Sequence, residues 1–530
     1  MLTACFVLSA ADSAITPASA QDDASPKWGA HIDLEGKAGT ERNLGEGDMF
    51  LPLLQNDDTM LFANLRARFD DDNSREGNFG LGIRHMLESG WNIGGIAYFD
   101  RRETEWNNYF NQVTLGAEAL STDWDFRANA YIPQGRETHE VSALNEASLS
   151  GTTVSIRAGA ERSMSGFDGE IGWRLHLYEP EAPQQIRLFA GGYHFSADDV
   201  STITGPRLRG EMTFDEVPWL WEGSRFSVGS EWQHDNPRGS QGFVTARLRI
   251  PLQFFGKSSR RLTPMERRMT DPVMRDIDIV SQSGAFGPAE TATGTADGQT
   301  LTIIPSSSIA NTAALNNALI SAGANTVIID GTINVTALVN MAVGQTLVGS
   351  GSITVKAPSG REAVLSVSGG KIAATDTNLS HVLSMRNNTK LIGMNVSNSN
   401  NSITGTFAVD VQGRTDATIE NSTITAFSSG GAGTAIDARN TTNLVIRNNT
   451  LSASSNTQTA TGIQVAGASN VTIASNTFSI STSGTKTVIA GGFAATSFNA
   501  ASTGNTTNAG SCSFSTAPTG SVGFSTINCP

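Results

Sequence analysis

Apolar and polar residues alternate along the first half of this chain in one short segment after another, and this pattern limits its folds more than any other feature. Residues 61–69 place Leu, Ala, Leu, Ala and Phe on one face of a strand, and Phe, Asn, Arg and Arg on the other. Residues 124–130 and 242–254 repeat the arrangement. Successive side chains of a β-strand point to opposite faces. The pattern therefore predicts strands with one apolar face and one face that carries Arg, Asp and Glu.

The apolar face is best explained by lipid. The chain has no apolar run approaching the roughly 20 residues that a membrane-spanning helix needs, so a membrane crossing must use strands. A closed barrel pairs every backbone group, with lipid outside and a polar lumen inside. All eight Trp and all five Tyr lie between residues 28 and 232, as expected for aromatic belts at two membrane interfaces. A soluble all-β domain is the alternative. We expect an all-β protein whose residues 28–254 form a transmembrane antiparallel barrel of about 12 strands.

The number of strands decides which loops lie outside the cell. Candidate strands, including one over residues 154–160, begin near residues 28, 48, 59, 76, 91, 109, 123, 152, 165, 185, 206, 223 and 241. A barrel with both ends in the periplasm needs an even number. The least certain strand is Asp48–Gln55, because Pro52 interrupts it. The long loop Pro133–Ser150 lies outside if Asp48–Gln55 is a strand, and inside if it is not.

Several of these segments resemble a known family. Leu61-Phe-Ala-Asn-Leu-Arg-Ala-Arg, Asn78-Phe-Gly-Leu-Gly-Ile-Arg, Gly90-Trp-Asn-Ile-Gly-Gly-Ile-Ala-Tyr-Phe-Asp and Leu115-Gly-Ala-Glu are similar to the β-domain of inverse autotransporters, the intimin and invasin group. The resemblance covers roughly residues 28–280. It implies a twelve-stranded barrel in the outer membrane of a Gram-negative bacterium, with a C-terminal passenger on the cell surface. Leu252 and Phe254 resemble the closing signal read by the outer-membrane assembly machinery.

Residues 1–20 read as the remnant of a secretion signal. Ala18-Ser19-Ala20 is a small-x-small cleavage pattern. A basic segment is missing ahead of it, and Asp12 interrupts the apolar stretch, so we expect the true start to lie upstream. Leu2-Thr3-Ala4-Cys5 resembles a lipoprotein acylation box, but no hydrophobic segment precedes it.

Residues 255–282 differ in character and are expected to cross the barrel lumen. Pro264 after Thr263 favours a helix start. A mixed extended and helical segment of this length can span roughly 40 Å. We expect the linker residues Arg267, Arg268 and Arg275 to pair with inward carboxylates such as Asp168 and Glu170. A plain periplasmic tail is the competing interpretation.

A repeat of 27 residues dominates the C-terminal half. Val382, Val409, Ile436 and Ile463 follow this interval, as do Ile392, Ile419, Ile446 and Ile473. Asp416, Asn443 and Asn470 keep the same spacing, and so do Asn449 and Asn476. Such a register predicts a parallel β-helix with 27-residue rungs, the Ile ladder inside and Asn side chains hydrogen-bonded along the axis. Gly344-Gln-Thr-Leu-Val-Gly-Ser-Gly-Ser resembles the pectate-lyase-like right-handed β-helix superfamily.

The other C-terminal segments complete the predicted organisation. Residues 283–310, rich in Gly, Ala, Ser and Thr, are interpreted as a spacer. The β-helix passenger is assigned to residues 311–495, with a short amphipathic helix near 313–320 capping its first rung. Cys512 and Cys529 are expected to form a disulfide that closes the tip, residues 496–530, two free thiols being the alternative.

We expect no catalytic, cofactor or metal site. Asp410 and Asp437 occupy adjacent rungs, near the separation of a retaining glycosidase pair. Each lies between apolar residues that should face inward, so both are predicted to point to solvent, with Arg414 or Arg439 offsetting their charge. The next rung has Gln464 instead. His176 is interpreted as part of a lumen charge network. A basic face for nucleic acid is also missing, because acidic and basic residues are equally numerous from Ser281 onward.

The sequence thus predicts an inverse autotransporter that displays a β-helix adhesin. Its expected partners are outer-membrane lipid, the assembly machinery and an unidentified extracellular or host-surface ligand. The runner-up is the same architecture carrying a polysaccharide lyase or hydrolase. A simple channel with a C-terminal tail is a third possibility.

Overall fold

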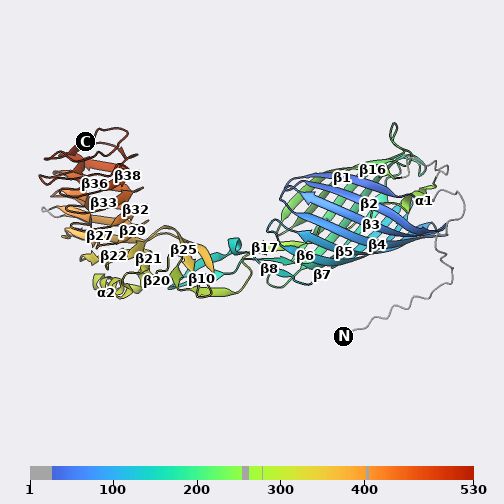
Figure 1. Cartoon of the computed structure of the whole chain (residues 1–530), viewed down its shortest axis with the longest axis horizontal. Helices are drawn as coiled ribbons and strands as arrows, with labels where there is room; N and C mark the ends of the chain where they lie inside the picture. Colours follow the sequence, from blue (N-terminus) through green and yellow to red (C-terminus); the bar gives the residue numbers. More distant parts are fainter. Residues whose placement is uncertain (1–26, 253–261, 277, 402–404, 530) are drawn as a thin grey trace. The chain divides into compact units, whose positions relative to one another are not determined.

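The computed structural model describes residues 27–252, 262–276, 278–401 and 405–529 (Figure 1). They form two compact units, each described by itself below. The first comprises residues up to Val141 together with Ala160–Phe286, and the second comprises Ser142–Gly159 together with Gly287–Pro530. None of the helices in the described residues combines the length and hydropathy of a membrane span.

The first unit is a closed antiparallel barrel. Among the described residues its strands number twelve, and β1 pairs with β16 to close it, from His31 opposite Pro251 to Gly39 opposite Phe243. The strands are β1 (His31–Gly39), β2 (Leu44–Gln55), β3 (Thr59–Asp70), β4 (Arg75–Leu87), β5 (Trp91–Glu103), β6 (Tyr109–Ser121), β7 (Trp124–Gln134), β12 (Ser165–Arg174), β13 (Gln184–Ser196), β14 (Ile203–Asp215), β15 (Arg225–Asp235) and β16 (Gly239–Pro251).

The two faces of the barrel are those predicted from the alternation. Phe69, Phe126 and Val244 on the outer face are 59%, 42% and 66% exposed. Arg66 and Asp125 on the inner face are buried. An outer surface of exposed aromatic and aliphatic side chains is what lipid contact requires.

Two expectations about strand number are resolved. Residues 48–55 lie in β2, and a register shift between Pro52 and Leu54 accommodates the proline, which has no N–H to donate. The candidate strand near residue 152 is not in the barrel. Val154 and Ile156 are buried in the second unit, so their alternation reflects a small protein core rather than lipid. Twelve strands remain. β7 therefore ends, and β12 begins, at the end of the barrel opposite the start of β1 and the end of β16.

The loop between β7 and β12 carries its own secondary structure, of which the alternation indicated only the strand near residue 152. It contains β8 (Thr138–Glu140), η1 (Ser142–Leu144), β9 (Glu146–Ser150), β10 (Thr153–Arg157) and β11 (Ala160–Ser163). Two strands that follow the barrel in sequence pair with it: β17 (Ser281–Gly284) with β11, and β18 (Ala289–Ala292) with β10. Residues 283–310, expected to be a spacer, therefore contain strands.

The second unit is a parallel β-solenoid with three seven-stranded sheets in its described residues. The first sheet holds β20 (Leu301–Pro305), β21 (Thr326–Asp330), β24 (Thr346–Val348), β29 (Lys390–Ile392), β32 (Thr418–Glu420), β35 (Val445–Arg447) and β38 (Thr472–Ala474). The second holds β22 (Thr332–Asn334), β27 (Lys371–Thr377), β30 (Asn395–Asn400), β33 (Thr423–Ser428), β36 (Thr450–Ser455), β39 (Thr477–Thr482) and β41 (Thr506–Thr507). The third holds β23 (Val339–Asn340), β28 (His381–Ser384), β31 (Thr406–Asp410), β34 (Gly433–Asp437), β37 (Ala460–Gln464), β40 (Lys486–Ala490) and β42 (Ser511–Ser513).

The 27-residue register holds in the middle rungs but not in the first ones. Ile419, Ile446 and Ile473 pair in sequence and are fully buried. Ile392, predicted to begin this ladder, instead lies opposite Glu420, and Leu391 is the buried partner of Ile419. Likewise Leu383, not Val382, pairs with Val409. The turns of this rung differ in length from those that follow, so equal sequence spacing assigns the wrong neighbour there.

The solenoid core is covered at its first rung by α2 (Thr312–Ala322). Asn311 caps this helix by accepting from the Ala314 N–H. Leu315 and Leu319 pack on the core, close to the positions expected for an amphipathic cap. A smaller antiparallel sheet of β19 (Gly294–Thr295), β25 (Gly351–Lys356) and β26 (Glu362–Val367) completes the unit, with a short helical turn η2 (Ser306–Ser308).

Candidate functional site

The first candidate is the barrel lumen, which is occupied by residues 263–276 and 278–280, called the lumen segment below. It begins with α1 (Pro264–Arg268), and Thr263 and Glu266 form a capping box. At this end of the barrel the Trp28 indole N–H donates to the Glu266 carbonyl at 2.8 Å. At the other end, the Met164 N–H donates to the Val280 carbonyl at 2.9 Å. The lumen segment therefore runs from one end of the barrel to the other.

Basic residues of the lumen segment pair with the barrel wall, but with partners other than those expected. Arg268 forms a bidentate contact with Asp125, at 2.6 and 2.8 Å. Arg275 pairs with Asp100 at 3.0 Å, and Arg267 lies 3.5 Å from Asp215. Because a planar guanidinium donates to both carboxylate oxygens at once, the Arg268 pair fixes the orientation of the two side chains as well as matching their charges.

Asp168 and Glu170, the predicted partners, contact arginines of the wall itself. Asp168 pairs with Arg207 at 3.4 Å, and Glu170 pairs with Arg209 at 2.9 Å. Both carboxylates project from the same strand, β12. Sequence alternation correctly indicated that they face inward, but it does not show which of many inward arginines is nearest.

Wall arginines also bind the backbone of the lumen segment. Arg84, fully buried, donates to the Met269 and Asp271 carbonyls at 2.8 and 2.7 Å. Arg66 donates to the Val273 carbonyl at 3.0 Å, halfway along. Backbone groups of a chain without a strand partner are thereby satisfied. The segment is held along its length by these polar contacts, and its Met269 and Val273 also pack in a buried apolar cluster with barrel residues that include Phe62 and Tyr98.

Little free volume remains around the lumen segment. One cavity of about 80 Å³ lies beside Arg268, and another of about 40 Å³ lies beside Arg275. Each has space for only a few water molecules. His176, predicted to belong to this network, lies instead in the turn after β12, where its Nε2 is 3.4 Å from Asp123.

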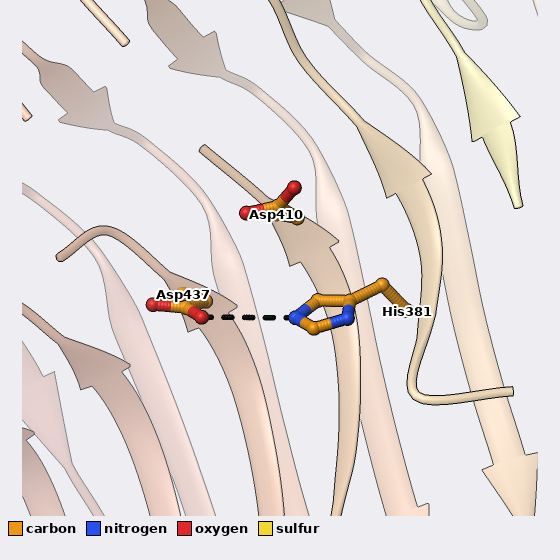
Figure 2. Close-up of side chains that lie close together, drawn as sticks. All are labelled: His381, Asp410 and Asp437. Carbon is orange, nitrogen blue, oxygen red and sulfur yellow. Dashed lines mark ion pairs between the residues drawn. The ribbon is translucent and has the colours of Figure 1, made fainter. Parts of the chain in front are cut away.

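A second candidate lies on the third sheet of the solenoid, where His381, Asp410 and Asp437 form what we call the rung cluster (Figure 2). They come from β28, β31 and β34. His381 Nε2 is 3.6 Å from Asp437 Oδ2, and the imidazole stacks on Phe407 with ring centroids 4.5 Å apart. The Ser384 hydroxyl donates to Asp410 at 2.9 Å.

Asp437 does not reach solvent as predicted, although Arg439 offsets its charge as expected. Its exposed fraction is 0%, because His381 and Arg439 cover it. Arg439 binds both carboxylate oxygens, at 2.8 and 2.6 Å. Burial acts to raise the pKa of Asp437, but the nearby His381 and the hydrogen bonds from Arg439 outweigh it and hold that pKa below its usual range. Hydrogen bonding to Asp437 in turn raises the pKa of Arg439.

These contacts restrict what the rung cluster can do. Its three side chains offer ligand atoms within 4.8 Å of one another, a spacing compatible with a bound cation. However, Arg439 already supplies Asp437 with its compensating positive charge. A carboxylate held ionised is also unsuited to donate a proton as a general acid. The cluster fits a structural ion pair better than a metal or catalytic centre.

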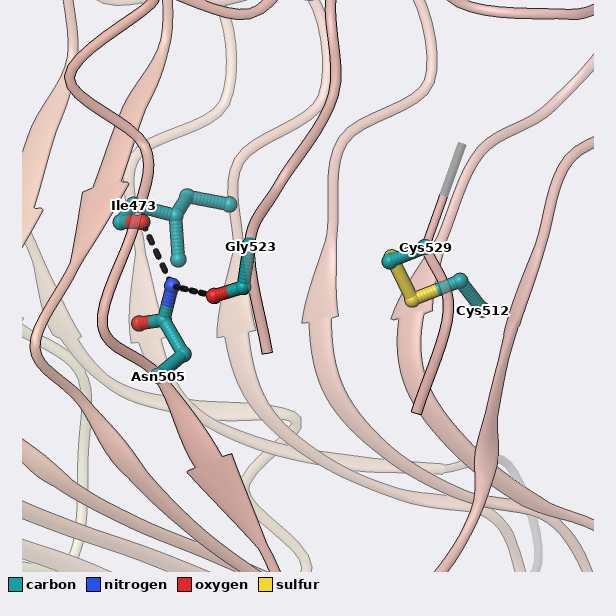
Figure 3. The surroundings of a disulfide bond; sticks show 5 residues. All are labelled: Ile473, Asn505, Cys512, Gly523 and Cys529. Carbon is teal, nitrogen blue, oxygen red and sulfur yellow. Dashed lines mark hydrogen bonds between the residues drawn. A yellow bond between two sulfur atoms is a disulfide. The ribbon is translucent and has the colours of Figure 1, made fainter. Parts of the chain in front are cut away.

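The solenoid contains a buried asparagine ladder that the sequence spacing revealed only in part. Asn449 and Asn476, 27 residues apart, both lie inside, and each donates its side-chain N–H to a carbonyl of the preceding rung. Asn505 extends the ladder and donates to the Ile473 and Gly523 carbonyls (Figure 3). It escapes a strict repeat search because it lies 29 residues after Asn476.

The remaining predicted residues lie at the ends of the two units. Cys512 and Cys529 are bonded to each other, with Cα atoms 5.3 Å apart (Figure 3). Leu252 directly follows β16 and is 39% exposed. Phe254, with residues 1–20, lies outside the described residues.

Together these features define a class: an outer-membrane barrel that is filled by its own chain and followed by a C-terminal passenger. Residues 9–207 match the family model described as "Inverse autotransporter, beta-domain". The barrel is thus an inverse autotransporter β-domain, and the protein is located in the bacterial outer membrane. The match covers less than half of the chain and does not extend to the solenoid. The pectate-lyase-like resemblance therefore stays a prediction.

Other comparisons add little. No curated protein matches the sequence. An outer membrane channel from Pseudomonas putida F1 aligns over 44% of this chain and 99% of its own, with 10% identity and a TM-score of 0.32. The translocator domain of the autotransporter NalP from Neisseria meningitidis aligns over 42% of this chain and 88% of its own, with 8% identity and a TM-score of 0.24. Similarities this weak carry no argument about function.

Proposed function

We propose that the barrel exports the chain that follows it and displays the β-solenoid on the cell surface as a binding module. The observation that carries the proposal is the end-to-end course of the lumen segment. Strand β16 ends beside the start of β1, and the segment enters the lumen at that same end, where Trp28 contacts Glu266. A barrel with an even number of strands keeps both of its own termini on one side. Residues beyond Val280 then emerge on the opposite side, which is the cell exterior.

The contents of the lumen favour display over conduction. Arg268 and Arg275 bind the wall by charge-assisted hydrogen bonds, and the two cavities described beside them have volumes of only about 80 and 40 Å³. A channel requires an open path, and this lumen is filled. We infer that residues Leu252 and Phe254 present the closing strand to the assembly machinery, and that the barrel exterior contacts outer-membrane lipid.

A binding role for the solenoid, adhesion to an extracellular or host-surface ligand, is part of the same proposal. It is supported by the class of barrel and by the long regular surface of a β-solenoid, on which stacked rungs present aligned side chains. We do not extend the proposal to a polysaccharide lyase or hydrolase, because Asp437, one of its two candidate carboxylates, is bound on both oxygens by Arg439.

Protease shaving of intact cells tests the proposal. We expect external protease to release fragments from residues 287–530 and to leave the barrel intact. A matched sample with a permeabilised outer membrane controls for protease activity. Release of solenoid fragments only after permeabilisation would place the solenoid in the periplasm and contradict the proposal.

A further inference from the structure

The long loop between β7 and β12 contains strands with which the emerging chain pairs. Residues 280–292 run antiparallel to residues 154–164 of this loop. In the first unit Ala160 lies opposite Gly284 and Ser163 opposite Ser281. In the second unit Val154 lies opposite Ala292 and Arg157 opposite Ala289. The emerging chain is thus paired with the loop almost from the point where it leaves the lumen.

The join between the two paired stretches is also hydrogen-bonded. The Gly287 N–H donates to the Ala158 carbonyl at 2.9 Å, and the Ala158 N–H donates to the Pro288 carbonyl at 3.3 Å. A Cβ placed on Gly287 would lie 2.7 Å from the Ala158 Cβ. The backbone at residue 287 therefore approaches Ala158 too closely for any residue other than glycine.

A buried carboxylate anchors the first stretch. Glu161 in β11 is 3% exposed. It accepts from the hydroxyl of Ser281 at 3.0 Å and from that of Thr104, in the barrel turn after β5, at 2.7 Å. A buried charge needs such partners, and here one partner is the first residue of β17. The exit chain therefore supplies a hydrogen-bond donor to the buried carboxylate of the loop.

The second stretch joins the loop to the hydrophobic interior of the passenger. Strands β9 and β10 form a hairpin about Gly151, whose φ of +58° suits glycine. Val154 and Ile156 of β10 are 1% and 0% exposed, and they pack with a cluster that includes Leu365 and Val367 of β26. Asn145 in the same loop donates to the Glu362 carbonyl at 2.9 Å. Without the loop, an apolar face and a strand edge of the passenger would be left uncovered.

We propose that residues 138–163 are a folding template, on which the emerging passenger forms its first strands and from which the solenoid grows outward rung by rung. The proposal rests on the export function proposed above. A parallel solenoid is slow to nucleate, because each rung needs a neighbour before its backbone groups are paired. A hairpin joined through β11 to the barrel strand β12 in sequence supplies that neighbour as soon as residues 281–292 emerge. The partner of this surface is the chain's own exit segment.

The test uses the full chain in intact cells. Ile156→Asp places a carboxylate in the apolar cluster, whereas Ser155→Asp places the same charge on the opposite face of the same strand. We expect Ile156→Asp to slow the appearance of protease-resistant solenoid about ten-fold or more, and Ser155→Asp to change it less than two-fold. Retarded gel migration of the unheated barrel should be the same in both, which separates passenger folding from barrel assembly.

Cross-linking gives the order of events independently. Ser155 lies opposite Thr291, so Ser155→Cys with Thr291→Cys should cross-link in chains lacking the native cysteines, and should do so before residues 486–490 become protease-resistant. Arg157→Cys with Thr291→Cys is the off-register control. Cross-linking only after the solenoid is complete, or equal rates for the two Asp variants on a displayed solenoid, would overturn the template. A solenoid inaccessible from outside in the unchanged chain would overturn the export function and the template together.

Discussion

At the scale of single residues, Asp437 shows how a solenoid position can be outward in its strand pattern and yet fully buried. The side chain leaves the third sheet on its outer face, where His381 from an earlier rung and Arg439 from its own turn close over it. Burial of a carboxylate is tolerated when its lone pairs are used by charged donors. The ion pair therefore fixes the local geometry of three successive rungs.

Replacing Asp437 by Asn should lower solenoid stability by about 1–2 kcal/mol at neutral pH, because Arg439 loses its charged partner. The pKa of Asp437 is lower in the folded state than in the unfolded state. Its contribution to the free energy of unfolding is therefore complete above the unfolded-state pKa of about 4, and it is lost as the pH falls through the folded-state pKa. Thermal melts followed by circular dichroism should show the two proteins converging below about pH 4. Asp410→Asn is the matched control. An undiminished difference at pH 2 would refute this assignment.

Ile446→Asp should destabilise the solenoid by several kcal/mol. Ile446 is buried between Ile419 and Ile473, and a carboxylate at this position would have no partner for its charge. Thr450→Asp, on the exposed start of β36, should change stability by less than about 1 kcal/mol. Comparable losses for both variants in the same melts would mean that the 27-residue register does not describe stacked rungs.

At the scale of elements, the tip is held by the asparagine ladder as well as by the disulfide. Asn505 ties the ladder to Gly523, six residues before Cys529. Cys512→Ser should leave surface display intact and increase protease cleavage after residue 495, because the tip follows the last regular rungs. Asn505→Ala should have a similar local effect, since it removes the side-chain donor to the Ile473 carbonyl and the acceptor of the Asn476 N–H. Immunoblots of shaved cells measure both. Loss of display in Cys512→Ser would show instead that the tip takes part in export.

Much of the element order was predictable, for physical reasons that particular residues illustrate. Two-residue alternation identified Leu65, Phe69 and Phe126 as lipid-facing, because each barrel strand has one lipid face. The same rule failed at Val154 and Ile156, since alternation looks the same whether the apolar face meets lipid or protein. Equal spacing identified Ile419 and Ile446 but misassigned Ile392, whose rung differs in length. The partners of Arg268 and the cover over Asp437 depend on contacts between distant segments, and no local pattern records these.

At the scale of the whole molecule, the chain segment that leads from the barrel toward the solenoid is bound at several positions within the first unit. Arg268 on Asp125 and Arg275 on Asp100 hold the lumen segment, and β17 then joins the loop strand β11. Arg268→Glu would place a third carboxylate beside Asp125 and Asp271. We expect this variant to reach the membrane with a folded barrel but with a loosened lumen segment, detected as increased single-channel current. Arg157→Glu, exposed in β10, is the control.

The central claim is that the chain fills its own barrel on the way out, and planar-bilayer conductance tests it most directly. The full chain and a chain ending at Phe254 should be compared under the same conditions. We predict a small or intermittent current for the full chain, and a large steady conductance for the shorter chain, whose lumen lacks residues 263–280. An equally large, steady conductance from both chains would contradict a filled lumen, and with it the proposed route of the passenger to the cell surface.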